Sequence, residues 1–551
     1  MNTIARRRSA AAQNSAESSS SAASPVGDQK IYRLVRASMA SSHAQNGTDN
    51  DGAPCSQTKT AFIQNDVRPA IRNLFPGVSI MDAAELRSAQ QHVFLISTSF
   101  DDPFTIQQPH DQNNPTTPEQ LNITSDTNNR MKLRRELERG CGKLIARRWR
   151  NSARFWNLNT SSNTAEDILM IARAEVAGYR VARRLICDGG DGSKEKRDMI
   201  PQVLYFSHDI SDVSDDANYA YQTEEIWGLF AYVGEGSASF RQTSRIHEGN
   251  FANQMVKVRH EFGFDEPHPR HGRVVEEHCL AYALKIIDQV IIPLHDCAHR
   301  QSSQGHSLIF SEREQVLLGV DGRSRRPFSF GYMLDLYEGA SVKMGEHIIS
   351  LQMNSNETNK LCGASQYRFD RLVGAIQSGS KELRGEVVAT QTTVPFTLVH
   401  CDLQPQNLIF WRRDQTFDDF SEKTHSYVPN IACILDWEEA ALADLRFELL
   451  LVCRKVCASM EQATSVWNYY REATLSRHQL DIGSLEPWLK LEGLHSITTM
   501  AMQALLGGGR GPWEKKSDLI CKIDRELLRL VSLGMISCKS ALSSGHGEQR
   551  A

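Results

Sequence analysis

The sequence predicts an α+β protein of two lobes, in which short apolar strands carry the polar side chains of one site. Apolar runs of strand length recur before residue 235, and longer segments with helical spacing follow it. Between residues 396 and 436, three further apolar runs are each bounded by a polar residue. A chain of 551 residues is long enough to bury the cores of two lobes.

The composition excludes several classes of function. Apolar residues make up 40% of the chain and charged residues 23%, and the formal net charge is -4. This leaves no basic field for nucleic acid or acidic lipid, so neither partner is expected. No apolar stretch has the length needed to span a bilayer. The 12 cysteines form no CxxC pair, which favours reduced thiols in a reducing compartment.

Residues 1–58 are predicted to be a disordered tail. They are rich in Ser, Ala, Asn and Gln and poor in large apolar side chains, so they bury too little surface to offset ordering. Three arginines at positions 6–8 precede the first acidic residue, Glu17. Two interpretations stay open: the tail of a cytoplasmic protein, or an organellar transit peptide.

The strand ends between residues 396 and 436 define the predicted site. The first apolar run, 396–399, is followed by Asp402, the second starts directly after Asn407, and the third, 431–435, ends at Asp436. A loop bearing Asp402 and Asn407 is therefore held at both ends. We expect these buried strands to deliver the three polar side chains to one edge.

This spacing suits phosphoryl transfer from a nucleoside triphosphate. In that chemistry Asp402 accepts the proton of the attacking hydroxyl. The amide oxygen of Asn407 and the carboxylate of Asp436 hold Mg²⁺ against the phosphates, because hard cations prefer oxygen ligands.

The same residues resemble the aminoglycoside phosphotransferase and choline kinase superfamily. There, HGDLHPGN is followed by a hydrophobic strand and by IDWE or IDFE; here the segments are HCDLQPQN at 400–407 and ILDWE at 434–438. The departures are Cys401 in place of Gly and Gln404 in place of His, and neither alters the three chemical groups. The chain does not resemble a eukaryotic protein kinase, because HRD, DFG, APE and a glycine-rich loop are missing.

The resemblance implies a divergent member with a protein-kinase-like two-lobe fold. It implies a nucleotide-binding N-lobe with a small antiparallel sheet over residues 59–235, and a larger, mainly helical C-lobe over 236–545 that carries the catalytic loop and binds the acceptor. ATP and Mg²⁺ are the implied cofactors, and a small-molecule hydroxyl is the implied acceptor. A nucleotide-binding pseudokinase or scaffold on the same fold stays open as an alternative.

The resemblance also aligns residues 143–150 with the third strand of the nucleotide lobe. This puts Arg147 at the position of the basic residue that contacts the α and β phosphates. Lys143 and Arg148 stay open as alternatives.

Glu175 is the expected partner of Arg147. A helix beginning at Thr164, with Asn163-Thr164 as the cap candidate, has an apolar stripe that Glu175 continues, and a carboxylate on a buried face needs a partner. The alternative is that Glu175 lies at the edge of a solvated face.

Further elements complete the predicted lobes. We expect an amphipathic helix over 62–75, a first strand over 91–97, and strands over 200–206 and 226–233. A long helix is expected over 275–292, and helical periodicity continues over 447–535.

The resemblance assigns supporting roles to several residues. His400 and Asp444 support the catalytic loop, Asp444 by hydrogen bonds. Backbone groups for adenine come from the end of the last N-lobe strand, at Phe230, Ala231, Tyr232 and Val233.

Four other features have competing interpretations. The histidine-rich segment 260–271 favours a structured loop over a zinc site, and the glycine run 507–511 favours an interhelical turn over a phosphate cradle. Glu438 and Glu439 suggest an acidic mouth for a cationic acceptor. Four aromatic residues either line an acceptor pocket or belong to the core: Trp467, Tyr469, Tyr470 and Trp488.

Overall fold

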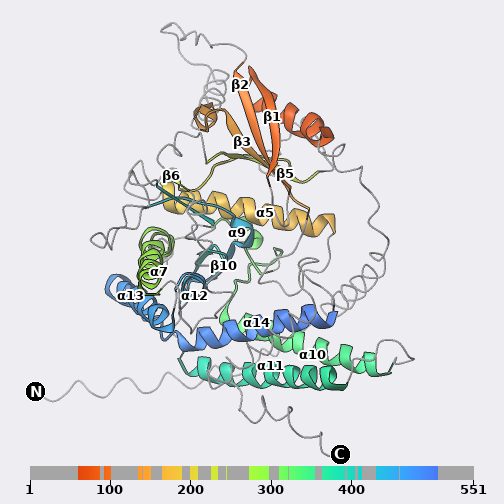
Figure 1. The fold of residues 1–551 in the computed structure, drawn as a ribbon, viewed down its shortest axis with the longest axis vertical. Coiled ribbons are helices and arrows are strands. Elements are labelled where there is room, and N and C mark those ends of the chain that lie inside the picture. The colour runs from red at the N-terminus through yellow and green to blue at the C-terminus, as the bar shows by residue number, and fades with distance from the viewer. Residues whose placement is uncertain are drawn as a thin grey trace, which may run out of the picture. The chain divides into compact units, whose positions relative to one another are not determined.

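The computed structural model describes most of the chain between residues 60 and 506, and Figure 1 draws the rest as a thin grey trace. All described residues belong to one structural unit, Thr48–Ala551. The predicted tail, the histidine-rich segment and the glycine run lie outside the described residues. The described ranges are 60–86, 92–100, 134–138, 140–150, 164–188, 199–208, 225–233, 243–244, 272–296, 310–320, 322–353, 363–390, 394–403, 407–411, 430–457 and 459–506.

A five-stranded antiparallel sheet forms the N-terminal part, in the order β1-β2-β3-β5-β4. The strand predicted to be the first, over 91–97, is the second strand of this sheet, β2. The first strand, β1, was not predicted, because most of its side chains are not buried and its sequence therefore shows no apolar alternation. The strands are β1 (Val78–Leu86), β2 (His92–Phe100), β3 (Lys143–Arg148), β4 (Val203–Phe206) and β5 (Trp227–Ala231).

The two faces of this sheet pack against different helices. One face buries Leu144 and Ala146 against the helix predicted over 62–75, which is present as η1 (Ile63–Val67) and α3 (Arg68–Leu74). The other face packs on α5 (Ala165–Ala182), whose first turn is capped by Thr164, one of the two residues of the predicted cap. Because side chains alternate along a strand, Arg147 points to the α5 face, opposite to Ala146.

Three short strands of the C-terminal part, β7, β8 and β9, form at the predicted apolar runs. Strands β8 and β9 pair antiparallel beside β6, and β7 pairs with β10. The 3-10 helix η9 (Trp437–Glu439) connects β9 to β10. The strands are β6 (Thr243–Ser244), β7 (Phe396–Val399), β8 (Leu408–Trp411), β9 (Ile431–Ile434) and β10 (Ala441–Asp444).

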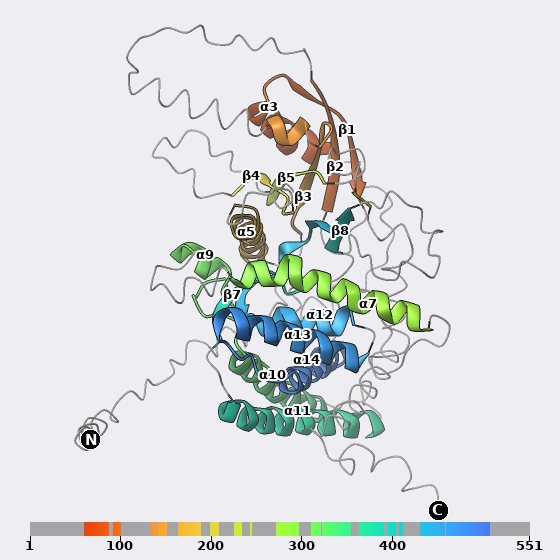
Figure 2. The ribbon, with the colours of Figure 1, turned by 90° about the vertical axis from the view of Figure 1, so that its left-hand side faces the viewer.

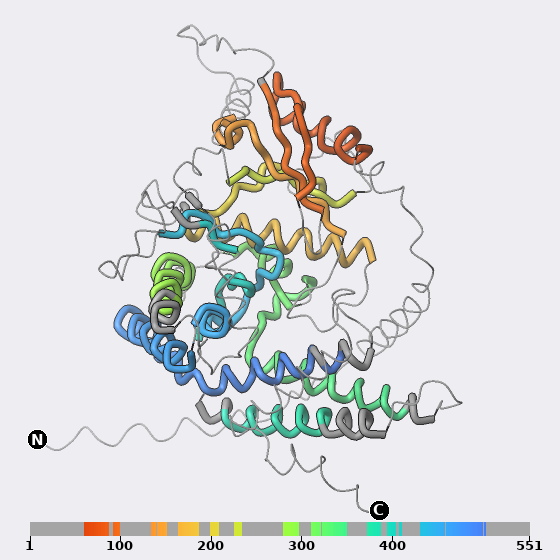
Figure 3. Tube along the Cα trace, in the orientation of Figure 1, coloured from red at the N-terminus to blue at the C-terminus, as the bar shows by residue number. Residues whose placement is uncertain are grey.

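Helices dominate the C-terminal part, as predicted. Figures 2 and 3 show α10, α11 and α14 lying side by side, and the expected long helix is present as α7 with its extension η6. None of the helices in the described part is both long and apolar enough to cross a membrane. The elements are α7 (Gly272–Ile286), η6 (Ile287–Ile291), α9 (Glu312–Leu317), α10 (Phe330–Met353), α11 (Gly363–Thr390), α12 (Arg446–Lys455), α13 (Met460–His478) and α14 (Glu486–Leu506), besides η2 (Arg183–Asp188) after α5.

Helix α5 approaches η9 closely at Gly178. A Cβ atom placed there would lie 2.8 Å from the Cβ of Ala440 and 3.5 Å from that of Trp437. The absence of a side chain therefore sets the distance between α5 and the turn that follows β9.

We predict that Gly178→Ala destabilises the fold by about 1–3 kcal/mol, because the added methyl group forces α5 away from η9. The control is Gly339→Ala in α10, where a Cβ atom meets nothing within 4 Å. There the substitution stabilises by roughly 0.5–1 kcal/mol through helix propensity. Urea unfolding followed by circular dichroism measures both, and equal effects would contradict the close approach.

Candidate active site

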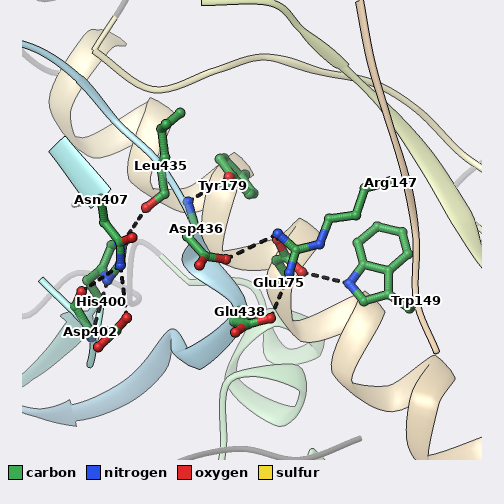
Figure 4. Close-up of polar contacts among 10 residues, drawn as sticks. All are labelled: Arg147, Trp149, Glu175, Tyr179, His400, Asp402, Asn407, Leu435, Asp436 and Glu438. Carbon is green, nitrogen blue, oxygen red and sulfur yellow. Dashed lines mark hydrogen bonds and ion pairs between the residues drawn. The ribbon is translucent and has the colours of Figure 1, made fainter. Parts of the chain in front are cut away.

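The pairing of β8 with β9 brings Asn407 and Asp436 to the same end of a sheet. Leu408 pairs with Ile434, and the N–H of Leu435 donates to the carbonyl oxygen of Asn407 at 2.8 Å. Asn407 therefore lies just before the start of β8, next to the end of β9, which Asp436 follows. Figure 4 shows both side chains on this side of the strands, with Asp402 beside Asn407.

Asn407 is bonded to the proposed base. Its Nδ2 donates to the backbone oxygen of Asp402 and to Oδ2 of the same residue, both at 2.9 Å. Because the amide nitrogen is committed to Asp402, the amide oxygen of the buried Asn407 side chain is the atom suited to a cation. The metal-binding role of Asn407 stays a prediction.

His400 connects the catalytic loop to the end of β9. Burial lowers its pKa, so the imidazole is neutral. Its Nδ1 accepts from the N–H of Asp402 at 3.2 Å, which places the proton on Nε2, and Nε2 donates to the carbonyl oxygen of Leu435 at 2.8 Å. With both nitrogens used, His400 supports the loop, as the resemblance implied.

Two residues of the site have left-handed backbone conformations. Cys401 has φ 60° and Asp436 has φ 63°. Aspartate tolerates this region better than most residues, whereas cysteine is strained in it. The turn at Asp436 is held from α5, because the hydroxyl of Tyr179 accepts from the N–H of Asp436 at 3.0 Å.

Arg147 lies among three carboxylates. Its Nη1 is 3.0 Å from Glu175 and 3.1 Å from Asp436, and its Nη2 is 2.6 Å from Glu438. Glu175 is fully buried, and its second oxygen accepts from Nε1 of Trp149 at 2.6 Å. The inward interpretation of Glu175 is confirmed, and Figure 4 shows the guanidinium between the three acids.

Burial and charge shift two pKa values in this group. Burial alone would lower the pKa of Arg147, but the three carboxylates outweigh it and keep the guanidinium charged. For Glu438, burial and then the neighbouring Asp436 and Glu175 act against the attraction of Arg147, and its pKa rises to about 8. The crowding of acidic side chains around one guanidinium therefore favours the protonated form of Glu438.

The other two candidates for the phosphate-contacting cation have different surroundings. Arg148 points to the opposite face of the sheet and pairs with Glu225, with Nε 2.6 Å from Oε2. Lys143 lies over the ring of Tyr232, 5.6 Å from its centroid. Arg147 is thus the one of the three that the structure places beside Glu175, and its contact with phosphate stays a prediction.

The contact assigned to Asp444 is made by a different carboxylate. Asp444 binds Arg446, with Oδ2 2.6 Å from Nη2. Glu448, in the first turn of α12, accepts a hydrogen bond from the N–H of His400 and so holds the start of the catalytic loop. Full burial raises the pKa of Glu448 to about 8. Sequence spacing alone did not show that this contact comes from the helix and not from the end of β10.

Lys455 is a site residue that sequence analysis missed. Its Nζ contacts Oδ1 of Asp402, and the two side chains are 25% and 24% exposed. A lysine in the last turn of a helix is common on its own account, so the sequence carries no signal for this contact.

At the end of β5, which is predicted to bind adenine, one of the backbone groups is already used in a hydrogen bond. The N–H of Ala231 donates to the carbonyl oxygen of Gln202 at 2.9 Å, so it is not a donor for a base. Phe230 is buried and packs on Tyr179, with ring centroids 5.1 Å apart. The roles of Tyr232 and Val233, which follow the strand, stay predictions.

The aromatic residues of α13 and α14 are core for the most part. Trp467, Tyr470 and Trp488 are buried. Tyr469 is 40% exposed and its hydroxyl binds Asp288 at 2.7 Å. The core interpretation is confirmed for the three buried side chains.

The donor set fits Mg²⁺ bound partly by a substrate. In the described part of the chain, no three His, Cys, Asp or Glu side chains form a metal cluster. Asn407 offers an amide oxygen, and Asp436, 36% exposed, offers the carboxylate oxygen that Arg147 does not bind. Magnesium is commonly held by one or two protein ligands with phosphates and waters completing the octahedron.

Comparison with known proteins gives weak similarity. No family model matches the chain, and no curated protein matches it by sequence. A solved ethanolamine kinase of Plasmodium vivax is 10% identical with a TM-score of 0.39, covering 92% of this chain and 95% of its own. A choline/ethanolamine kinase family protein from Mesorhizobium loti is 13% identical with a TM-score of 0.30, covering 67% and 83%. A function for the chain is therefore inferred from its own geometry.

We predict that Arg147→Met lowers the free energy of unfolding by about 3–5 kcal/mol, because it leaves the buried Glu175 without its counter-ion. Adding Glu175→Gln to the same chain should recover part of this loss, because the uncompensated charge is then removed. Urea unfolding of the two single variants and the double variant measures the coupling. Additive losses would show that the pair does not interact.

We also predict that Glu448→Gln flattens the pH dependence of stability. Between the ordinary pKa of 4.5 and about 8, folded Glu448 retains a proton that the unfolded chain has released. The contribution of Glu448 to the free energy of unfolding is therefore complete below pH 4.5 and is lost as the pH rises to about 8. The loss amounts to at most about 1.4 kcal/mol for each pH unit.

Glutamine mimics the protonated acid, so Glu448→Gln should be the more stable form at pH 8 and similar to the wild type at pH 5. Thermal unfolding across this range measures the difference. Glu448→Ala, which removes the acceptor of the loop N–H, should be less stable at every pH. A wild type that gains stability from pH 5 to 8 relative to Glu448→Gln would refute the assignment.

Proposed function

We propose that the chain is a small-molecule kinase that transfers the γ-phosphoryl group of ATP, with Mg²⁺, to a hydroxyl group of a small acceptor. The observation that carries the proposal is the arrangement at the ends of β8 and β9. There a carboxylate bonded to an amide, Asp402 with Asn407, lies beside the carboxylate Asp436. Arg147 joins this group to Glu175 of the N-terminal part. This set provides the base, metal ligands and phosphate-binding cation that phosphoryl transfer needs.

Each residue has a role that follows from its contacts. Asp402 accepts the proton of the acceptor hydroxyl, a function worth roughly 10²–10⁴ in rate. Asn407 and Asp436 hold Mg²⁺, which when bound would neutralise charge on the phosphates. Arg147 contacts the phosphates and Glu175 fixes its orientation.

The reaction balances with these groups alone. The acceptor O–H bond breaks and its proton passes to Asp402, while the acceptor oxygen bonds to the γ-phosphorus. The bond between the γ-phosphorus and the bridging oxygen breaks, and its electron pair leaves with ADP.

The contacts of Arg147 favour a second candidate function. The guanidinium is bound to Asp436 and Glu438 as well as to Glu175, so it has to release carboxylates before it can bind phosphate. A nucleotide-binding protein or scaffold without turnover would be consistent with such a site. Turnover assays separate this candidate from the kinase.

We predict that Asp436→Ala abolishes binding of Mg-ATP, whereas Asp402→Ala retains binding and loses turnover by roughly 10²–10⁴. Asp436→Asn, which suits the left-handed backbone at this position, removes the charge while keeping the turn. Calorimetric titration with Mg-ATP measures binding.

The control is Asp481→Ala, which removes a carboxylate from an exposed ion pair with Arg471. Equal ATP affinity in the wild type and the Asp436 variants would contradict the metal assignment. An ATP-consumption screen over amino alcohols, sugars and aminoglycosides then identifies the acceptor. Binding without consumption of ATP across the screen would support the scaffold.

A further inference from the structure

Lys455 is the last residue of α12, and its ammonium group lies on the proposed base. Its Nζ contacts Oδ1 of Asp402, while Oδ2 of the same carboxylate accepts from Asn407 at 2.9 Å. Both side chains of the ion pair are about a quarter exposed, at 25% and 24%. A ligand can therefore reach the pair from solvent.

Helix α12 holds the catalytic loop at two points. Glu448, near its start, accepts from the N–H of His400, and Lys455, at its end, contacts Asp402. The position of the ammonium group is therefore fixed relative to the loop by the helix. Lysine is also favoured in the last turn of a helix by the helix dipole, but this does not account for the direction of its side chain.

The charge of the site requires a cation beyond Arg147. The transferring phosphoryl group carries negative charge on its equatorial oxygens. The catalytic loop, 400–407, contains no lysine or arginine, and Arg147 is already shared among three carboxylates. Lys455 contacts Asp402 and so places a second cation at the candidate site.

Proximity to Asp402 implies proximity to the γ-phosphoryl group. The acceptor oxygen has to lie within hydrogen-bonding distance of Asp402 and roughly 3–3.5 Å from the phosphorus. A group that touches this carboxylate therefore lies next to the reacting atoms. Lysine has three donors on a flexible stem, so one ammonium group can contact a carboxylate and a phosphoryl oxygen together.

We propose that Lys455 binds the γ-phosphoryl group of the nucleotide from its position on Asp402. This inference rests on the proposed function. Lys455 keeps its proton throughout: the proton of the acceptor goes to Asp402, and the leaving electron pair goes to ADP. The role of Lys455 is to attract the γ-phosphoryl oxygens and to hold the carboxylate in place for the acceptor.

The test compares two nucleotides that differ in the γ-phosphoryl group. Calorimetry measures the affinity of the full chain for Mg-ADP and for the Mg-bound β,γ-imido analogue of ATP. In Lys455→Met the affinity for the analogue should fall roughly tenfold or more, because a charge-assisted contact is lost, while the affinity for Mg-ADP stays within about twofold. Lys455→Arg keeps the charge and should retain most of the affinity for the analogue.

Lys490→Met is the matched control. Lys490 is also a lysine with carboxylate partners, Glu386 at 2.8 Å and Glu486 at 3.1 Å, and its own side chain is only 9% exposed. Its loss should leave the ratio of the two affinities unchanged. Should Lys455→Met fail to fold, Lys455→Gln, which keeps a hydrogen bond to Asp402 without the charge, takes its place.

The outcomes separate this inference from the proposed function. An equal loss for both nucleotides in Lys455→Met, or no loss for either, overturns the role of Lys455 and leaves the kinase standing. A wild type that binds neither nucleotide refutes the proposed function, and the inference falls with it.

Discussion

The buried guanidinium of Arg147 is the interaction on which the rest of the site depends. It is 12% exposed and bound to a fully buried carboxylate, Glu175, and neither charge is tolerable in that environment without the other. Its remaining contacts reach Asp436 and Glu438, which are about 290 residues away in the sequence. One charge-balance requirement therefore ties the sheet, helix α5 and the turn after β9 together. The turn that carries Asp436, the proposed metal ligand, is therefore held in position by its contacts with Arg147.

The strands explain why polar groups meet at one place. Leu408 and Ile409 of β8 and all four residues of β9 are apolar and buried, and the antiparallel pairing of the strands leaves their polar neighbours, Asn407 and Asp436, at one end. The neutral His400 then connects the loop after β7 to the backbone after β9. Backbone pairing thus provides the coarse position, and buried hydrogen bonds fix the side chains.

Sequence patterns predicted the parts of the fold that bury continuous apolar runs. The strands before and after Asn407, the helix beginning at Thr164 and the inward direction of Glu175 all follow from such runs. Strand β1 was not predicted, because most of its side chains are not buried and its sequence shows no apolar alternation.

Two contacts that sequence analysis misplaced or missed are made by α12. Asp444 ends β10 and Glu448 lies in the first turn of α12, and local spacing cannot tell which of them faces the catalytic loop. Lys455 has no pattern around it at all, since its partner, Asp402, lies on a different element. Side chains that act across two elements depend on tertiary packing, which periodicity does not encode.

Two helices, rather than the loops, set the geometry of the candidate site. Helix α5 contributes Glu175 and Tyr179, one turn apart, so a single helix face holds Arg147 and the backbone of Asp436. Helix α12 contributes Glu448 and Lys455, which hold the catalytic loop. A displacement of α5 changes the distance between Arg147 and the turn at Asp436, whereas a displacement of α12 changes the surroundings of Asp402. Because different helices carry these contacts, substitutions in α5 and in α12 should disturb different parts of the candidate site, although the same sheet end supports both.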